Sequence, residues 1–469
     1  MRLRRRLPAL LLATAAAATP VTAADGATWS APQTVTATPH TFAGPLSLTT
    51  TFDGSLIAAW PWQDNAGTDA RGGASTAARP PLASFAGGAP ATSAFTAERP
   101  APDGLVALAP FGRTQTLALA LQGLPGRPGP TGAILQRLKV AFGAAGGGFG
   151  TARTLVTAAI LGRPQLAAAG SRALISWIEV TRTSSGATRR VVRAIERRDG
   201  RFGAPFTLSG RGRADVLAVA LGQGRDEAVA FVRQGDVLAR VRRPGHRWGS
   251  VQRVARATGP THWQLVAAAD ARGQVRLIWR RHQFRQSATP GRTALEGTAM
   301  LVGRGRFAAV QTIEPDGASA PALTLAAAGW ALADVQATPE GPRPTLHRTH
   351  GGLAFGGAQY AGPAQGGLRG TAVAFSPVGG IAVAWVQPLP GQDGAGEARA
   401  AMLDPGVPDA AFGPVEAISP AEAVSEVALG ADGRAGQPVA VWIARPDNPG
   451  PSVPLADVHT VVRSAIRVP

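Results

Sequence analysis

Cysteine is absent from the 469 residues, and lysine and tyrosine each occur once, as Lys139 and Tyr360. A chain without cysteine cannot form disulfides or thiolate metal sites, so its stability must come from packed area, which this length can supply. After the first residues no apolar run of about 20 residues occurs, which excludes a membrane-spanning helix. Extended helical spacing of apolar residues is also missing, which excludes a helical bundle.

Glycine and proline are abundant instead, with 59 and 39 residues. They punctuate segments of two-residue alternation that are rich in Val, Ile, Leu and Trp, and they follow no collagen-like period. The sequence therefore predicts a turn-rich, all-β protein.

The first 24 residues resemble an export signal. Four arginines among the first six residues precede an apolar stretch, and small residues around Ala23 follow it. We expect cleavage after Ala23 or Ala24, a single folded domain over residues 25–469, and a product that is extracellular or associated with the cell envelope.

Positive charge is concentrated in one part of the chain. The formal net charge is +18, and residues 181–310 hold 25 arginines against eight carboxylates, a local net of +17. Such a sector is typical of a surface that meets an anionic partner, although a solvated face that only aids solubility would look the same. Nucleic acid is a less favoured partner, because export removes the usual target and no nucleic-acid motif accompanies the charge.

Two kinds of segment alternate along the chain and reveal an internal repeat. The first kind is a pair of apolar stretches, and the second stretch of each pair ends at Trp60, Leu121, Trp177, Phe231, Trp279, Val335, Trp385 and Trp442. The second kind is an aromatic residue, usually followed by Gly, that opens an outer strand, as at Trp29, Phe149, Phe202, Trp248, Phe307, Phe355 and Phe412. A third strand lies between them, clearest at 189–197, 237–243, 298–304 and 458–466.

Four strands in about 55 residues, repeated along the chain, predict a β-propeller. We count eight units, and a seven-bladed ring is the alternative because the units at Leu121 and Val335 lack the aromatic anchor. The chain opens with an outer strand and closes with a third strand, so we expect both ends to share the last blade. One aromatic residue per repeat predicts blade-to-blade packing by the recurrent tryptophans rather than ligand stacking.

The aromatic-Gly strand after a tight turn resembles the repeats of secreted bacterial propellers related to sialidases, which carry an Asp-box in that turn. Asp199, Gly200 and Phe202 are the nearest match to the box, which is degenerate elsewhere, as at Pro244 and Gly245. The resemblance implies the fold and, for a sialidase, a tyrosine nucleophile. Tyr360 lies in a predicted outer strand far from the ring axis, so we expect no sialidase chemistry and name no catalytic residue.

No cofactor or metal site is predicted. The seven histidines are scattered apart from His347 and His350, which a strand would place on opposite faces, so we expect surface histidines. Glycoside hydrolysis needs two facing carboxylates, for which Glu340, Asp393, Glu397 and Asp447 are conceivable.

Connections between second and third strands are the long ones, at 63–80, 181–188, 282–297, 337–344, 388–397 and 445–457, and they share one rim. Arginines of the basic sector fall on this rim, and guanidinium groups bind carboxylate, sulfate and phosphate oxygens. The predicted ligand-binding residues are Arg182, Arg189, Arg190, Arg280, Arg281, Arg285 and Arg292.

The sequence thus favours a non-catalytic, monomeric, secreted propeller that binds an anionic polysaccharide or envelope polymer. Two other hypotheses stay open. One is a sialidase-like or other carbohydrate-active enzyme with its site in the central depression, and the other is a protein-binding scaffold with an exposed apolar rim patch.

Overall fold

The computed structural model describes the chain in segments. They are residues 28–35, 42–43, 46–51, 55–63, 70–76, 99–129, 133–144, 148–210, 212–222, 226–256, 262–270, 272–283, 292–301, 303–315, 322–326, 329–349, 352–376, 380–389, 396–404, 411–420, 422–431, 437–445 and 460–468. Every regular element in these segments is a β-strand, which confirms the predicted all-β class. The expected export signal, Arg285 and His350 lie outside the described residues.

The strands form sheets in which first, second and third strands pair antiparallel in chain order. The first strands are β4 (Ser47–Thr50), β8 (Leu105–Phe111), β13 (Ile160–Ala169), β18 (Ala214–Leu221), β22 (His262–Ala269), β27 (Ala322–Ala326), β31 (Arg369–Phe375) and β35 (Ala423–Ala431). The second strands are β5 (Leu56–Gln63), β9 (Gln115–Pro128), β14 (Arg172–Arg182), β19 (Glu227–Arg233), β23 (Val275–Gln283), β28 (Gly329–Thr338), β32 (Ile381–Pro388) and β36 (Pro438–Arg445).

The remaining strands lie farther out. The third strands are β6 (Ala70–Thr76), β10 (Ile134–Ala144), β15 (Thr188–Arg198), β20 (Asp236–Arg242), β24 (Arg292–Leu301), β29 (Gly341–Arg348), β33 (Gly396–Leu403) and β37 (Val461–Val468). The outer strands are short and often split: β7 (Arg99–Ala101), β11 (Gly148–Phe149) with β12 (Arg153–Ala158), β16 (Arg201–Phe202) with β17 (Phe206–Thr207), β21 (Gln252–Ala255), β25 (Arg306–Phe307) with β26 (Gln311–Glu314), β30 (Gln359–Tyr360) and β34 (Glu416–Ala417). A short strand, β3 (Phe42–Ala43), also pairs with β5.

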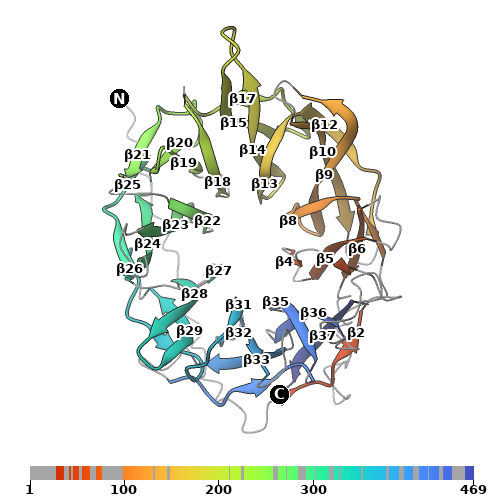
Figure 1. Cartoon of the computed structure of the whole chain (residues 1–469), viewed down its shortest axis with the longest axis vertical. Helices are drawn as coiled ribbons and strands as arrows, with labels where there is room; N and C mark the ends of the chain where they lie inside the picture. The colour runs from red at the N-terminus through yellow and green to blue at the C-terminus, as the bar shows by residue number, and fades with distance from the viewer. Residues whose placement is uncertain are drawn as a thin grey trace, which may run out of the picture.

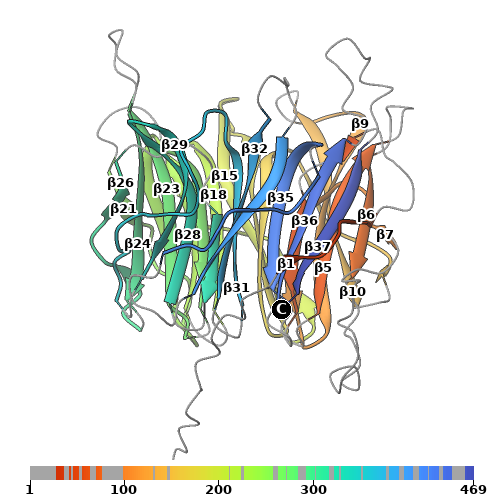
Figure 2. The ribbon, with the colours of Figure 1, turned by 90° about the horizontal axis from the view of Figure 1, so that it is seen from below.

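These sheets stand side by side around a common axis, with their first strands innermost (Figure 1), and the strands run from one edge of the molecule to the other (Figure 2). This radial arrangement of four-stranded antiparallel sheets is that of a β-propeller. The first strands contact one another in the order β4, β8, β13, β18, β22, β27, β31 and β35, and β35 contacts β4. At the chain ends, β1 (Thr28–Trp29) and β2 (Gln33–Thr34) both pair with β37.

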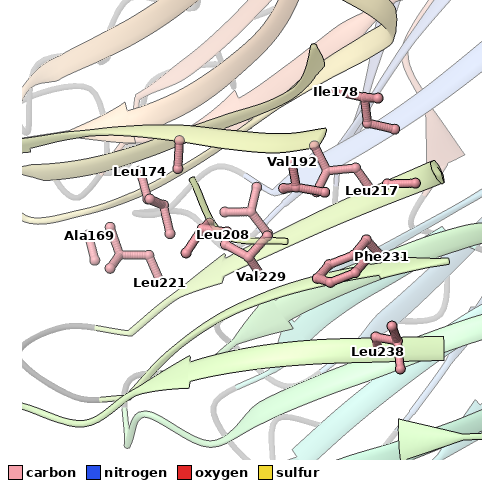
Figure 3. Packing of buried hydrophobic residues seen from close by; sticks show 13 residues of the cluster. Ala169, Leu174, Ile178, Val192, Leu208, Leu217, Leu221, Val229, Phe231 and Leu238 are labelled. Carbon is pink, nitrogen blue, oxygen red and sulfur yellow. The ribbon is translucent and has the colours of Figure 1, made fainter. Parts of the chain in front are cut away.

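The hydrophobic core lies between neighbouring sheets. Leu174 and Val192 of one sheet pack against Leu217 and Phe231 of the next (Figure 3). The recurrent tryptophans belong to this packing, since all five are fully buried on second strands: Trp60, Trp177, Trp279, Trp385 and Trp442. The prediction that they pack between blades is confirmed.

Close packing between sheets also requires small residues at certain positions. A Cβ on Gly362 would lie 2.7 Å from the Trp385 ring of the following sheet, so glycine leaves the room that the indole needs. Two predicted long connections are wrong. The strand β6 lies within 63–80, and in 337–344 β28 continues to Thr338 while β29 begins at Gly341. Pro342 and Pro344 lie within β29.

Candidate functional site

The strands of each sheet end at two opposite sides of the molecule, which we call edges and which differ in their connections. The turn edge carries the turn between first and second strands and the turn between third and outer strands, whereas the loop edge carries the connection between second and third strands. Arg172 begins β14 at the turn edge, and Arg182 ends it at the loop edge, where it pairs with Thr188. At about 3.3 Å per residue, the two edges lie roughly 30 Å apart.

Arginines at the loop edge were the predicted ligand-binding residues. Arg182 and Arg189 are exposed at the end of the β14–β15 hairpin. Arg190 forms an ion pair with Asp215 of the next sheet. Arg292 is the first residue of β24, and Arg285 falls outside the described residues. Two of the predicted residues therefore present exposed guanidinium groups at this edge.

Arg280 and Arg281 lie at the end of β23 and are held by carboxylates. The Arg280 side chain is only 1% exposed and forms an ion pair with Asp334 of the neighbouring sheet. Arg281 forms an ion pair with Glu296, with Nε 2.7 Å from Oε1. The sequence pattern does not reveal these pairs, because Asp334 is 54 residues away. Reversing the charge of Arg280 would therefore test folding rather than ligand binding.

The turn edge of the same sector is different. Among its described residues, seven arginines are exposed, and Asp199 is the exposed carboxylate. No ion pair joins six of them to a carboxylate in the described segments, and the seventh, Arg198, reaches Glu196 at 3.6 Å while staying 52% exposed. We call these residues the arginine surface: Arg198, Arg201, Arg243, Arg247, Arg272, Arg304 and Arg306.

The arginine surface is continuous across three neighbouring sheets. A Cβ on Gly305, between Arg304 and Arg306, would lie 3.4 Å from Arg243 Cδ, and Gly303 N donates to Asp226 Oδ2 across the same boundary at 3.1 Å. Because seven exposed guanidinium groups stand beside one exposed carboxylate in the described residues, this surface carries a positive potential.

A pocket of about 240 Å³ opens on the arginine surface where two sheets meet. Its lining includes Arg172 and Arg198 from one sheet and Glu227, Arg242 and Arg243 from the next. The buried Glu227 carboxylate uses one oxygen to accept a hydrogen bond from Arg172 and the other to accept one from Arg242. We call this the four-arginine pocket.

Arg242 forms the inner wall of the four-arginine pocket and is fixed on three sides. Besides Glu227, it forms an ion pair with Glu196 Oε1 at 2.7 Å, and its guanidinium lies 4.9 Å from the Trp248 ring centroid. Burial, together with the nearby charges of Arg198 and Arg242, lowers the pKa of the Arg172 guanidinium below its ordinary value. The pocket therefore holds more positive charge than its carboxylates balance.

A second cavity, of about 440 Å³, lies between first strands of the ring and is lined from β4, β8, β13, β31 and β35. Register shifts in β13 before Gln165 and in β35 before Glu426 mark bulges beside it. Arg163 Nε donates to Val106 O at 2.6 Å, and Glu426 Oε2 accepts from Leu46 N at 3.0 Å. Burial raises the pKa of Glu426, against the effects of the Leu46 N–H and Arg163, and burial lowers the pKa of Arg163.

Glu426 is the single carboxylate in the described lining of this central cavity. The two facing carboxylates that glycoside hydrolysis needs are therefore not brought together by the described residues. Glu340 and Glu397 form ion pairs with Arg343 and Arg399 instead. Asp393 and Asp447 lie outside the described residues.

Tyr360 lies on β30, an outer strand, where it is exposed beside the Arg343 guanidinium. This position agrees with its predicted distance from the axis.

His347 corrects the expectation of surface histidines, because it is buried, with Nδ1 3.4 Å from Gly356 O and Nε2 3.8 Å from Glu314 Oε2. The strand alternation of β29 directs it inward, which the lone histidine in the sequence does not reveal.

Acidification is expected to destabilise the protein partly through His347. Burial lowers its pKa, so the unfolded chain takes up the proton first as the pH falls below about 6.5, and stability declines by up to about 1.4 kcal/mol per pH unit from this residue. Urea unfolding at pH 5, 6 and 7 should show a shallower decline in His347→Gln, whose side chain can still donate to Gly356. Identical slopes in both proteins would contradict this assignment.

Within the described segments, no three metal-binding side chains cluster in a way that could hold an ion. A search of the same segments finds no helix with the length and apolar character to span a bilayer.

No family model and no curated protein matches the chain. Similar solved structures include an ulvan lyase from a new family of polysaccharide lyases, at 11% identity over 70% of this chain and 87% of that chain, with a TM-score of 0.42. A Dyadobacter fermentans protein of unknown function matches at 10% identity, 95% and 100% coverage and TM-score 0.43. The leech intramolecular trans-sialidase matches at 8% identity, 88% and 82% coverage and TM-score 0.39. Structural similarity at this level assigns neither an activity nor a ligand to this chain.

Proposed function

We propose that the protein is a secreted, non-catalytic β-propeller, folded as one domain over residues 25–469, that binds an anionic extracellular or cell-envelope polymer through its arginine-rich sector. The observation that carries this proposal is the arginine surface, with seven exposed arginines beside one exposed aspartate at the turn edge. The sector is the one that the sequence predicts, whereas the exposed arginines without carboxylate partners lie mainly at the edge opposite the predicted rim.

A polymer suits this surface better than an isolated small anion. The arginines extend over three sheets, so that successive charged groups of one chain could bind at once and add their free energies. Guanidinium groups bind carboxylate, sulfate and phosphate oxygens in paired hydrogen bonds. The rigid antiparallel sheets hold the arginine backbones in place, which reduces the entropy that binding must overcome.

The test is binding of the purified protein to acidic and neutral polysaccharides, teichoic-type polymers and DNA across a series of salt concentrations. We expect binding to acidic polymers that weakens steeply between 50 and 300 mM salt (roughly the range over which screening grows), because bound counterions are released. Equal affinity for neutral polymers, or no binding at low salt, would overturn the proposal.

We further infer a closed ring of eight blades, with both chain ends in the last blade. The nine-stranded sheet supports this count, because it contains the four-strand order twice, joined by one parallel pair between Gly396 and Ala423. Pairing of β1 and β2 with β37, and contact of β35 with β4, support closure. A closed ring leaves no open sheet face, which is consistent with a monomer.

The other two hypotheses have less support. A carbohydrate-active enzyme would use the central cavity, where Glu426 stands without a facing carboxylate in the described lining. A protein-binding scaffold would present a large apolar patch, yet the described segments expose only four large hydrophobic side chains: Ile134, Val310, Leu353 and Tyr360.

A further inference from the structure

We propose that the four-arginine pocket is a specific subsite for one tetrahedral oxyanion, a sulfate or phosphate group carried by the ligand. The inference rests on the proposed function in that the polymer would supply this group, but it makes a claim that the polymer proposal does not need. It assigns to Arg172, Arg198 and Arg243 direct contact with the oxyanion, and to Arg242 and Glu227 the role of positioning residues.

The guanidinium groups of the pocket keep hydrogen-bond donors available for a ligand. Each Glu227 oxygen accepts a hydrogen bond from one guanidinium, Oε1 from Arg172 and Oε2 from Arg242. Arg172 keeps further N–H groups with 25% of its side chain exposed, and Arg198 lies 3.6 Å from Glu196 with 52% of its side chain exposed. Arg243 is exposed in the turn that follows β20. Three guanidinium groups therefore have donors left for a ligand.

The pocket also carries an excess of positive charge. Four arginines line the pocket, and in the described residues two carboxylates, Glu227 and Glu196, form ion pairs with them. Two positive charges thus remain uncompensated in a space of about 240 Å³. The lowered pKa of Arg172 has crowding by Arg198 and Arg242 among its causes, and a bound dianion would relieve that repulsion.

Geometry distinguishes a tetrahedral oxyanion from a carboxylate. The available guanidinium groups come from three places, the start of β14, the end of β15 and the turn after β20. Donors that converge from several directions can each bind a different oxygen of a sulfate or phosphate group, whereas a planar carboxylate presents two oxygens in one plane. Arg242 cannot move away, because Glu196, Glu227 and Trp248 hold it.

The experiment is isothermal titration of the full chain with sodium sulfate, inorganic phosphate and sodium acetate, at constant ionic strength set with chloride. We expect sulfate and phosphate to bind at least 10-fold more tightly than acetate. Arginine does not titrate between pH 6 and 8, so sulfate affinity should stay constant there, while phosphate affinity should rise as the second proton dissociates. These two arms also show which oxyanion the pocket prefers.

Two double variants localise the binding. Arg198→Ala/Arg243→Ala removes two exposed side chains of the pocket, so the fold should persist while oxyanion affinity falls at least 10-fold. The matched control is Arg182→Ala/Arg189→Ala, which removes the same charge from exposed side chains at the loop edge, outside the arginine surface, and should leave sulfate and phosphate affinity unchanged. Equal loss in both variants would overturn the pocket as a specific subsite.

The two proposals fail in different ways. Polymer binding without any sulfate or phosphate binding, or acetate affinity equal to that of sulfate, would overturn the subsite and leave the polymer proposal standing. Oxyanion binding without binding to any acidic polymer would overturn the polymer proposal and leave the subsite standing.

Discussion

Replacement of Asp334 by alanine is expected to destabilise the protein by about 3–5 kcal/mol, the usual cost of leaving a buried charge without its partner. Arg280 is 1% exposed and Asp334 is fully buried, so water cannot replace the lost carboxylate. Asp334 Oδ1 also accepts from its neighbour, Val335 N, at 2.8 Å. Urea unfolding at pH 7 measures the change.

The matched variant is Arg280→Met/Asp334→Leu, which removes both charges and fills the space with apolar side chains. Because the desolvation cost of the pair disappears with the pair, this double variant should recover most of the stability that Asp334→Ala loses. An equal loss in the single and double variants would show that the cost comes from packing and not from the unpaired charge of Arg280.

The repeat made the fold predictable from the sequence. Apolar stretches that end at Trp177, Phe231 and Trp279 correspond to the second strands β14, β19 and β23, and the aromatic-Gly segments correspond to the outer strands. Each of these signals is local, since alternation and turn residues act over a few positions and recur in every unit. The errors at 63–80 and 337–344 have the same origin, because local polar composition suggested connections where strands form.

The site was less predictable than the fold, because the two residues of an ion pair can lie far apart in the sequence. The concentration of arginine at 181–310 indicates the sector that holds the arginine surface, but the sequence does not show that Asp334 pairs with Arg280 or that Asp215 pairs with Arg190. One signal was available. Arginine pairs end the third strands at 197–198 and 242–243, directly before a turn, in two consecutive repeats. The same position in consecutive units means the same edge, so this pattern could have indicated the turn edge.

Charge reversal at three positions of the arginine surface is expected to reduce acidic-polymer binding by at least about 100-fold, since each hydrogen bond to a charged group contributes roughly 1.5–3 kcal/mol. The variant is Arg243→Glu/Arg304→Glu/Arg306→Glu, and all three side chains are exposed. Because none forms an ion pair in the described segments, the unfolding free energy should change little. Affinity is measured by titration at 50 mM salt, with the salt dependence measured alongside.

The loop edge supplies a control with the same change in net charge. Arg182→Glu/Arg189→Glu/Arg256→Glu reverses three exposed arginines of the same sector, roughly 30 Å away across the sheets. If the net charge of the sector alone attracted the polymer, both variants would lose affinity equally. We expect the loop-edge variant to retain most of the affinity, because a bound polymer needs direct contacts at its own surface. A loss confined to the loop-edge variant would instead restore the ligand-binding role that the sequence predicts for Arg182 and Arg189.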